Sequence, residues 1–213
     1  MKKIFLLLLL MFTLTLSSCT VVKIKRFYEF ASSEAMDIEI TKYTDAGSEV
    51  IDLKYNTKIM IISMDDVSLA MDFKNDIVYV DYYGLKVYTV YELCYFEHGS
   101  ENTDMSNYVS NIKSIDDYLS FELDKKQLKM DQDKETDETD ENIICKVMFE
   151  EKRVSSIEML PLDSEEPEYT IKVNAYGDEV EGIELPSENE YSRNYIYDMI
   201  LRMLMDSLKE KLL

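Results

Sequence analysis

Apolar and polar residues alternate along the chain from residue 35 onward. Met36, Ile38 and Ile40 alternate with Asp37 and Glu39, which predicts a half-buried strand. The same period of two continues over residues 51–61, 67–73, 77–83 and 85–91. The turns between these segments are short, and parallel strands need a crossover of roughly a dozen residues. The pattern therefore predicts an antiparallel meander of five strands.

The period lengthens to three or four residues near 103–118, where Tyr108, Ile112 and Ile115 recur. This spacing predicts an amphipathic helix inserted between two groups of strands. Alternation returns in later segments, which predict strands over 119–123, 143–149, 154–160, 169–175 and 180–185. The sequence thus predicts an α+β fold, with a curved antiparallel sheet of about ten strands, open as a half-barrel, and helices on one face.

A long amphipathic helix is predicted at the C-terminus, over residues 187–213. Ser187 and Glu190 have the spacing of a capping box at its start. Its apolar positions form a broad face, whereas Arg193 and Arg202 contribute to a polar outer side. We expect the apolar face to lie across the concave face of the sheet, either as a permanent part of the core or as a movable lid.

The first 18 residues have the features of a secretory signal peptide. A basic start precedes an apolar run from Ile4 to Leu16, which is shorter than the roughly 20 residues that span a bilayer as a helix. The closing residues Leu16-Ser17-Ser18-Cys19 resemble the bacterial lipobox. Cleavage between Ser18 and Cys19 then leaves Cys19 as a diacylglyceryl-modified N-terminus, and two acyl chains suffice for stable anchoring. The alternative is an ordinary cleavage site with an incidental cysteine.

This arrangement predicts a protein that is anchored to a bacterial membrane on its extracytoplasmic side and does not span it. Residues 19–34 are expected to form the lipidated N-terminus and a tether. Lys23, Lys25 and Arg26 lie in this tether, where they attract anionic headgroups weakly.

The charge and composition exclude two classes of protein. The whole chain carries 43 acidic and 23 basic residues, a net charge of −20, and removal of Lys2 and Lys3 with the leader makes it −22. Such a charge repels phosphate backbones and argues against a nucleic-acid partner. With 46% hydrophobic residues, including 16 Tyr and 13 Met, the chain can build a core and is not a disordered acidic tail.

The sequence does not indicate a catalytic or metal site. His98 is the single histidine, and the chain lacks both the G-x-S-x-G elbow of serine hydrolases and the spacing of zinc ligands. The acid-rich stretch 131–141 begins like a calcium loop, but Thr136 and Asn142 replace the required Gly and Glu. We therefore predict a solvated hairpin loop there, and a non-enzymatic protein that uses no metal and no cofactor.

Two further cysteines, Cys94 and Cys145, lie in strand-like contexts. An exported pair allows one disulfide. The alternative is two unpaired buried cysteines that act as small hydrophobic residues.

The order of elements over residues 35–186 resembles the lipoprotein-carrier superfamily of half-barrels, which includes LolA and the LppX- and LprG-like lipoproteins. The resemblance rests on the meander, the helix before a second run of strands, and the segments 153–159, 169–177 and 184–186. Residues 20–34 depart from the family, because they are too short and broken for its usual N-terminal helix.

The resemblance implies a concave apolar surface that holds or senses a lipid or another hydrophobic ligand at the cell envelope. The candidate ligand face consists of Ile51, Leu53, Tyr55, Leu69, Met71, Phe73, Met199 and Met203. The alternative function is a cell-surface interaction or sensory module that binds an envelope protein through an acidic, Tyr-rich face. A continuous apolar cavity favours the first function, and a filled core with exposed tyrosines favours the second.

Overall fold

The computed structural model describes residues 20–93, 108–124, 126–127 and 142–212. The predictions on Ser18, Cys19, Cys94, His98 and residues 131–141 fall outside these ranges. The lipidation, the disulfide and the solvated loop therefore stay predictions. Within the described ranges, no helix is both long enough and apolar enough to cross a membrane.

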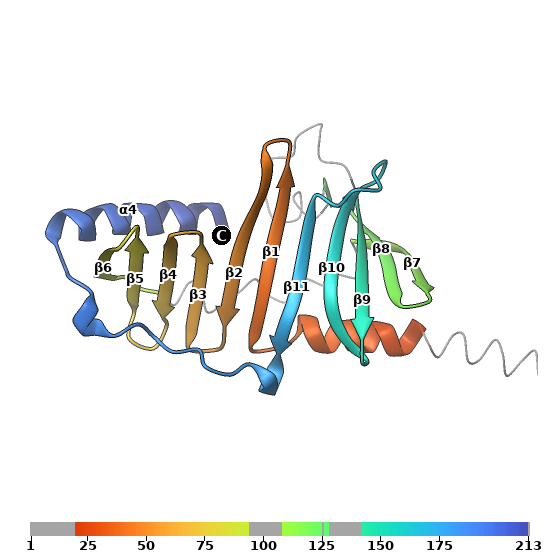
Figure 1. The fold of residues 1–213 in the computed structure, drawn as a ribbon, viewed down its shortest axis with the longest axis horizontal. Helices are drawn as coiled ribbons and strands as arrows, with labels where there is room; N and C mark the ends of the chain where they lie inside the picture. Colours follow the sequence, from red (N-terminus) through yellow and green to blue (C-terminus); the bar gives the residue numbers. More distant parts are fainter. Residues whose placement is uncertain (1–19, 94–107, 125, 128–141, 213) are drawn as a thin grey trace, which may run out of the picture. The chain divides into compact units, whose positions relative to one another are not determined.

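The described part of the chain forms one sheet of 11 strands (Figure 1). The strands are β1 (Met36–Thr44), β2 (Gly47–Tyr55), β3 (Ile59–Met64), β4 (Val67–Asp72), β5 (Ile77–Tyr82), β6 (Leu85–Val90), β7 (Val109–Ile115), β8 (Tyr118–Leu123), β9 (Ile143–Glu150), β10 (Arg153–Pro161) and β11 (Tyr169–Tyr176). Their order in the sheet is β6-β5-β4-β3-β2-β1-β11-β10-β9-β8-β7. A helix over residues 20–31 precedes them, and α4 (Tyr195–Leu212) follows them. The predicted fold class, an open antiparallel sheet with helices and a long C-terminal helix, is confirmed.

The chain divides into two compact units. Unit 1 contains Met1–Ser32 and Met105–Lys172, and unit 2 contains Ser33–Asp104 and Val173–Leu213. Unit 1 therefore holds the N-terminal helix and β7 to β10, whereas unit 2 holds β1 to β6 and α4. The strand β11 begins in unit 1 and ends in unit 2.

The helix over residues 20–31 packs on strands of unit 1. The Phe27 ring lies against Phe121 of β8, with 5.5 Å between the ring centroids. Phe30, one turn further along, is also buried. The strands contribute buried apolar side chains to the same unit, namely Leu119, Phe121, Ile143, Val147, Val154, Ile157 and Leu160.

Lys23 is a buried lysine on this helix. Its Nζ donates hydrogen bonds to the backbone carbonyls of Asp116 and Tyr118, the second at 3.2 Å. The prediction of a tether over residues 19–34 is therefore wrong for residues 20–31. The sequence did not predict a packed helix here because Lys23 interrupts its apolar side. In the structure, backbone carbonyls at the turn between β7 and β8 accept hydrogen bonds from the Lys23 ammonium group.

The helix predicted near 103–118 is also wrong where the structure describes it, because residues 109–115 form β7. Between Ser110 and Lys113 the β7–β8 register shifts, and Asn111 has a positive φ of 52°. This β-bulge adds one residue to β7, which breaks the two-residue alternation and imitates a helical period. Asp116 lies in the turn from β7 to β8.

The long strand predicted over 51–61 is two strands, β2 and β3. The side-chain oxygen of Asn56 accepts the backbone N–H groups of Lys58 and Ile59, at 2.8 and 2.9 Å, and forms the turn between them. The register then pairs Tyr55 with Met60. Ile59 consequently lies on the opposite face from Tyr55, although the uninterrupted alternation placed both on one face.

The segment between β11 and α4 differs from the prediction. It contains two short 3₁₀ helices, η2 (Gly177–Glu179) and η3 (Glu188–Glu190), and the strand predicted over 180–185 is not formed. The predicted capping box at Ser187 does not begin the long helix. Instead, Asn194 caps it, since its side-chain oxygen accepts the N–H of Ile196 at 2.9 Å.

This segment also covers the edge of β6. Ser192 donates its N–H to Lys86 at 3.1 Å and accepts the N–H of Tyr88 at 3.2 Å. Tyr191 places its ring edge against Tyr79, with centroids 5.3 Å apart. Tyr79 and α4 lie on opposite faces of the sheet, because α4 contacts Thr89, the strand neighbour of Tyr88. The chain therefore passes around the edge of β6 just before α4 begins.

Candidate functional site

One face of β1 to β4 is apolar. The register places Leu53 opposite Ile38 on one side and Ile62 on the other. Side chains two residues apart share a face, so this surface, here called the strand face, contains Met36, Ile38, Ile40, Ile51, Leu53, Tyr55, Met60, Ile62, Leu69 and Met71. Of the predicted ligand face, Ile51, Leu53, Tyr55, Leu69 and Met71 therefore lie on one face of the sheet, and Phe73 follows the end of β4.

The middle of the strand face is only half-buried. Ile51, Leu53 and Tyr55 of β2 all have intermediate exposure. Burial raises the pKa of the Tyr55 hydroxyl, which donates a hydrogen bond to the backbone carbonyl of Ser33 at 3.2 Å. At the other end of β2, Glu49 lies opposite Lys42 and ends the apolar stretch. The surface thus has an apolar centre with polar groups at both ends.

The helix α4 covers the strand face at β4 and the adjoining surface of β5 on the same side of the sheet. Met205 is 2% exposed and joins Met71, Val78 and Leu93 in one buried cluster. Leu201, one turn earlier, is also buried. Leu69 and Phe73 are partly buried and pack against the same cluster, together with Met60, Val80 and Tyr91. The space between α4 and these strands is therefore filled by side chains.

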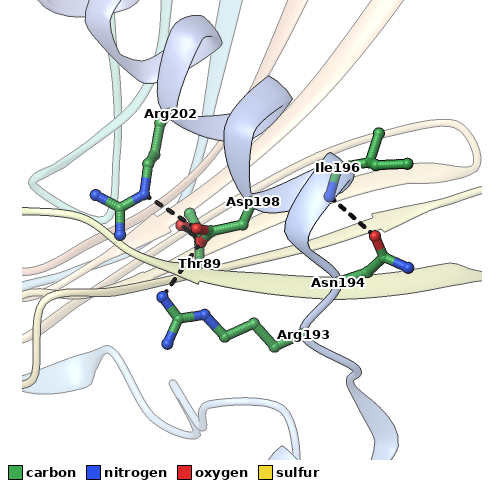
Figure 2. A network of polar contacts seen from close by, with 6 residues as sticks. All are labelled: Thr89, Arg193, Asn194, Ile196, Asp198 and Arg202. Atoms are coloured by element: carbon green, nitrogen blue, oxygen red, sulfur yellow. Dashed lines mark hydrogen bonds and ion pairs between the residues drawn. The ribbon is translucent and has the colours of Figure 1, made fainter.

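A polar network fixes the first turns of α4 to β6 (Figure 2). Thr89, which is fully buried, donates a hydrogen bond from its hydroxyl to the carboxylate of Asp198. Arg202 and Arg193 form ion pairs with the same carboxylate, at 3.3 and 3.6 Å. The Thr89 hydrogen bond is the main cause that lowers the pKa of Asp198, and both arginines lower it further.

A second hydrogen bond joins α4 to the residues after β6. Tyr91 donates its hydroxyl proton to the carboxylate of Asp206 at 2.7 Å. Asp198 and Asp206 are eight residues apart, which separates them by about 80° around the helix. The prediction of a polar outer side and an apolar inner side is therefore incomplete, because these two acids bond to the sheet beside the buried Leu201 and Met205.

The opposite side of α4 is apolar and exposed. Met199 and Met203 lie two residues before and after Leu201, which is about 160° around the helix from it. They are 47% and 65% exposed. The exposed apolar residues of α4 extend from the side opposite Leu201 around to its flank, and they are Tyr195, Ile196, Tyr197, Met199, Ile200, Met203 and Leu204. The prediction that Met199 and Met203 belong to the same ligand face as the strand residues is wrong, since α4 turns them away from the strands it contacts.

A polar depression of about 460 Å³ lies at the turns that join β3 to β4 and β5 to β6. Its lining includes Asp65, Asp66 and Asp81. Tyr83 also lines it and is 68% exposed, with its ring edge against Tyr82 at a centroid distance of 4.8 Å. Tyr83 and Gly84 both have positive φ, which gives the tight turn that presents these tyrosines. Three aspartates and two exposed tyrosines therefore lie close together at these turns.

Other predicted site residues contribute less to the described surface. Cys145 is buried in β9, and its proposed disulfide partner Cys94 lies outside the described ranges. Nowhere in the described residues do three His, Cys, Asp or Glu side chains gather in a way that could hold a metal ion.

The two-sided apolar character of α4 was missed at the sequence level, although a signal was present. Consecutive pairs such as Tyr195-Ile196 and Met199-Ile200 continue the apolar surface around the helix, beyond the single stripe of an ordinary surface helix.

No family model matches the sequence, and no curated protein matches it. Among solved structures, a likeness is found to the lipoprotein LppX of Mycobacterium tuberculosis, at 10% sequence identity and a TM-score of 0.44. The match covers 78% of this chain and 98% of that chain.

Proposed function

We propose that this protein is a membrane-anchored extracytoplasmic lipoprotein that holds or senses a lipid or another hydrophobic ligand and does not catalyse a reaction. The observation that supports this function is the half-buried apolar centre of the strand face, at Ile51, Leu53 and Tyr55. Folded proteins rarely leave continuous apolar surface open to water without a binding partner.

The chemistry of the strand face selects the class of ligand. From Tyr55 to Ile51 the β2 residues on this face are apolar, which suits an acyl chain, and Lys42 and Glu49 bound the stretch at one end. An apolar chain placed there gains roughly 25 cal/mol for each Å² of apolar surface removed from water. The ligand site lies beside the α4 core and not under the helix, since Met205 and its neighbours fill that space.

A matched pair of variants of the full chain tests this function. Ile51→Asp introduces a charge on the strand face, whereas Val50→Asp introduces the same charge on the opposite face of the same strand, where Val50 is 40% exposed. We expect Ile51→Asp to weaken binding of a fluorescent fatty-acid probe and Val50→Asp to leave it unchanged. Equal probe binding by wild type and both variants, or no binding by any of them, contradicts the proposal. Native mass spectrometry of protein from its own host then identifies the bound lipid.

Membrane anchoring through Cys19 is the second part of the proposed function. It rests on the sequence Leu16-Ser17-Ser18-Cys19 after the apolar leader. We expect Cys19→Ala to move the protein from the membrane fraction to the soluble fraction, or to leave an unprocessed precursor. A diacylglyceryl mass on any residue other than Cys19 contradicts this assignment.

A second candidate function is favoured by the depression near Tyr83. Its aspartates and exposed Tyr82 and Tyr83 suit a basic protein partner at the envelope. Tyr83→Ala should then abolish cross-linking to that partner while leaving binding of the fatty-acid probe intact. Retained cross-linking in Tyr83→Ala contradicts this candidate.

A further inference from the structure

The helix over residues 20–31 has two chemically different sides. Its inner side is held to unit 1 by Phe27 against Phe121 and by the buried ammonium group of Lys23. These contacts fix the rotation of the helix about its own axis, because Lys23 and Phe27 are one turn apart. The opposite side is consequently presented in a defined orientation.

Apolar residues and a basic residue occupy this opposite side. Val21, Ile24 and Tyr28 recur at spacings of three and four and are 64%, 39% and 70% exposed. Lys25 lies among them and forms only a solvent-exposed pair with Glu29, at 3.5 Å. Three apolar side chains that face water at the start of a domain need an explanation, since exposure of an apolar stripe on a packed helix is unfavourable.

The proposed lipid anchor lies directly before this helix in the sequence. Cys19 immediately precedes residue 20, which is the first described residue and already helical. One residue spans at most about 3.6 Å. An acylated Cys19 therefore holds the first turn of the helix at the membrane surface, without a linker that could separate them.

We propose that the outer side of the helix over residues 20–31, formed by Val21, Ile24, Lys25 and Tyr28, lies in the lipid–water interface of the membrane that carries the anchor. This inference rests on the anchoring of Cys19 given under Proposed function. Apolar side chains enter the boundary between headgroups and acyl chains, where Tyr is favoured because its ring is apolar and its hydroxyl polar.

The distribution of charge supports a bilayer as the occupant. The mature chain is strongly acidic, so most of its surface is repelled by an anionic membrane. Lys23 is turned inward, but Lys25 is exposed and Arg26 is half-buried, and the helix carries only one acidic residue, Glu29. Basic groups close to such a membrane are attracted to its anionic headgroups. The helix therefore combines an apolar surface with the charge that complements anionic headgroups, and it fixes the orientation of unit 1 on the membrane.

The absence of tryptophan from the chain allows a direct test. Tyr28→Trp and Tyr83→Trp each introduce a single tryptophan at tyrosines of nearly equal exposure, 70% and 68%. The full-length lipidated protein is reconstituted into vesicles of phosphatidylethanolamine and phosphatidylglycerol. We expect the emission of Trp at position 28 to shift to shorter wavelength and to be quenched by brominated phospholipid, whereas Trp at position 83 does neither.

A further substitution separates contact by the helix from anchoring by the lipid. Adding Val21→Asp to Tyr28→Trp should reduce the shift and the quenching, although the protein still floats with the vesicles. If the protein floats with the vesicles but Trp at positions 28 and 83 behaves identically, the interfacial contact is overturned and the anchoring stands. If Cys19 carries no diacylglyceryl group and the protein does not float, the anchoring fails and this inference with it. Binding of the fatty-acid probe to the strand face is measured independently of both results.

Discussion

Replacing Met205 by alanine tests whether α4 is a permanent part of the core. Met205 is 2% exposed and packs against Met71, Val78 and Leu93. Truncation of a methionine in such a cluster costs about 2–5 kcal/mol, because it removes apolar burial and leaves a cavity. Since m is about 1–3 kcal/mol/M for urea unfolding, the midpoint should fall by roughly 1 M or more.

Met203 is the matched control on the same helix. It is 65% exposed, and its truncation to alanine should change the free energy of unfolding by no more than about 0.5 kcal/mol. Equilibrium urea unfolding of both variants, followed by far-UV circular dichroism and tyrosine fluorescence, measures the difference. If the Met205→Ala midpoint shifts no further than that of Met203→Ala, α4 is not docked as described and a movable lid is the better account. Met199→Asp, by contrast, places its charge at an exposed position and should not unfold the protein.

Three further predictions concern other contacts. The pKa of Asp198 is lowered in the folded state, so its carboxylate stabilises the fold fully at pH values above the ordinary pKa of 3.8, and this stabilisation is lost as the pH falls through the pKa of the folded state. Acid unfolding curves of Asp198→Asn should lack this part of the pH dependence. A curve parallel to that of wild type refutes the assignment. Lys23→Met leaves the carbonyls of Asp116 and Tyr118 without their donor and should lower the free energy of unfolding in urea by about 1–3 kcal/mol. The exposed control Lys25→Met should leave this free energy nearly unchanged. Equal effects of the two substitutions contradict the buried role of Lys23. Replacing residues 131–141 by a short Gly-Asn turn should change the melting temperature little, because loop length affects stability only logarithmically, and unfolding on deletion or stabilisation of wild type by calcium contradicts the solvated loop.

Much of the sheet could be predicted because turns separate short segments of strand-forming residues, and in most of these segments one face is more apolar than the other. This holds for β1 and for β4 to β6, whose hairpins have short turns. The prediction from alternation failed where a turn or a bulge interrupts the regular backbone of a strand. At Asn56 a turn interrupts a pattern that continues through it, and at Asn111 a bulge inserts an extra residue.

The candidate site was predictable to the same extent. The shared face of Leu53 and Leu69 follows from strand parity and the meander, which are local properties of the sequence. The rotation of α4 does not follow, because its inner side is chosen by contacts with Thr89 and Met71, which are remote in the sequence. Lys23 shows the same limit, since the carbonyls that satisfy it come from a hairpin more than ninety residues further along the chain.

The hydrogen bonds of Ser192 with β6 have a consequence for how the protein avoids self-association. An uncovered edge strand offers its free N–H and C=O groups to any other chain, and this is a common route to aggregation. Ser192 occupies that position beside Lys86 and Tyr88, but it is synthesised 106 residues after Lys86. Until then β6 is open, so nascent or C-terminally clipped chains should form strand-paired aggregates that the complete chain does not form.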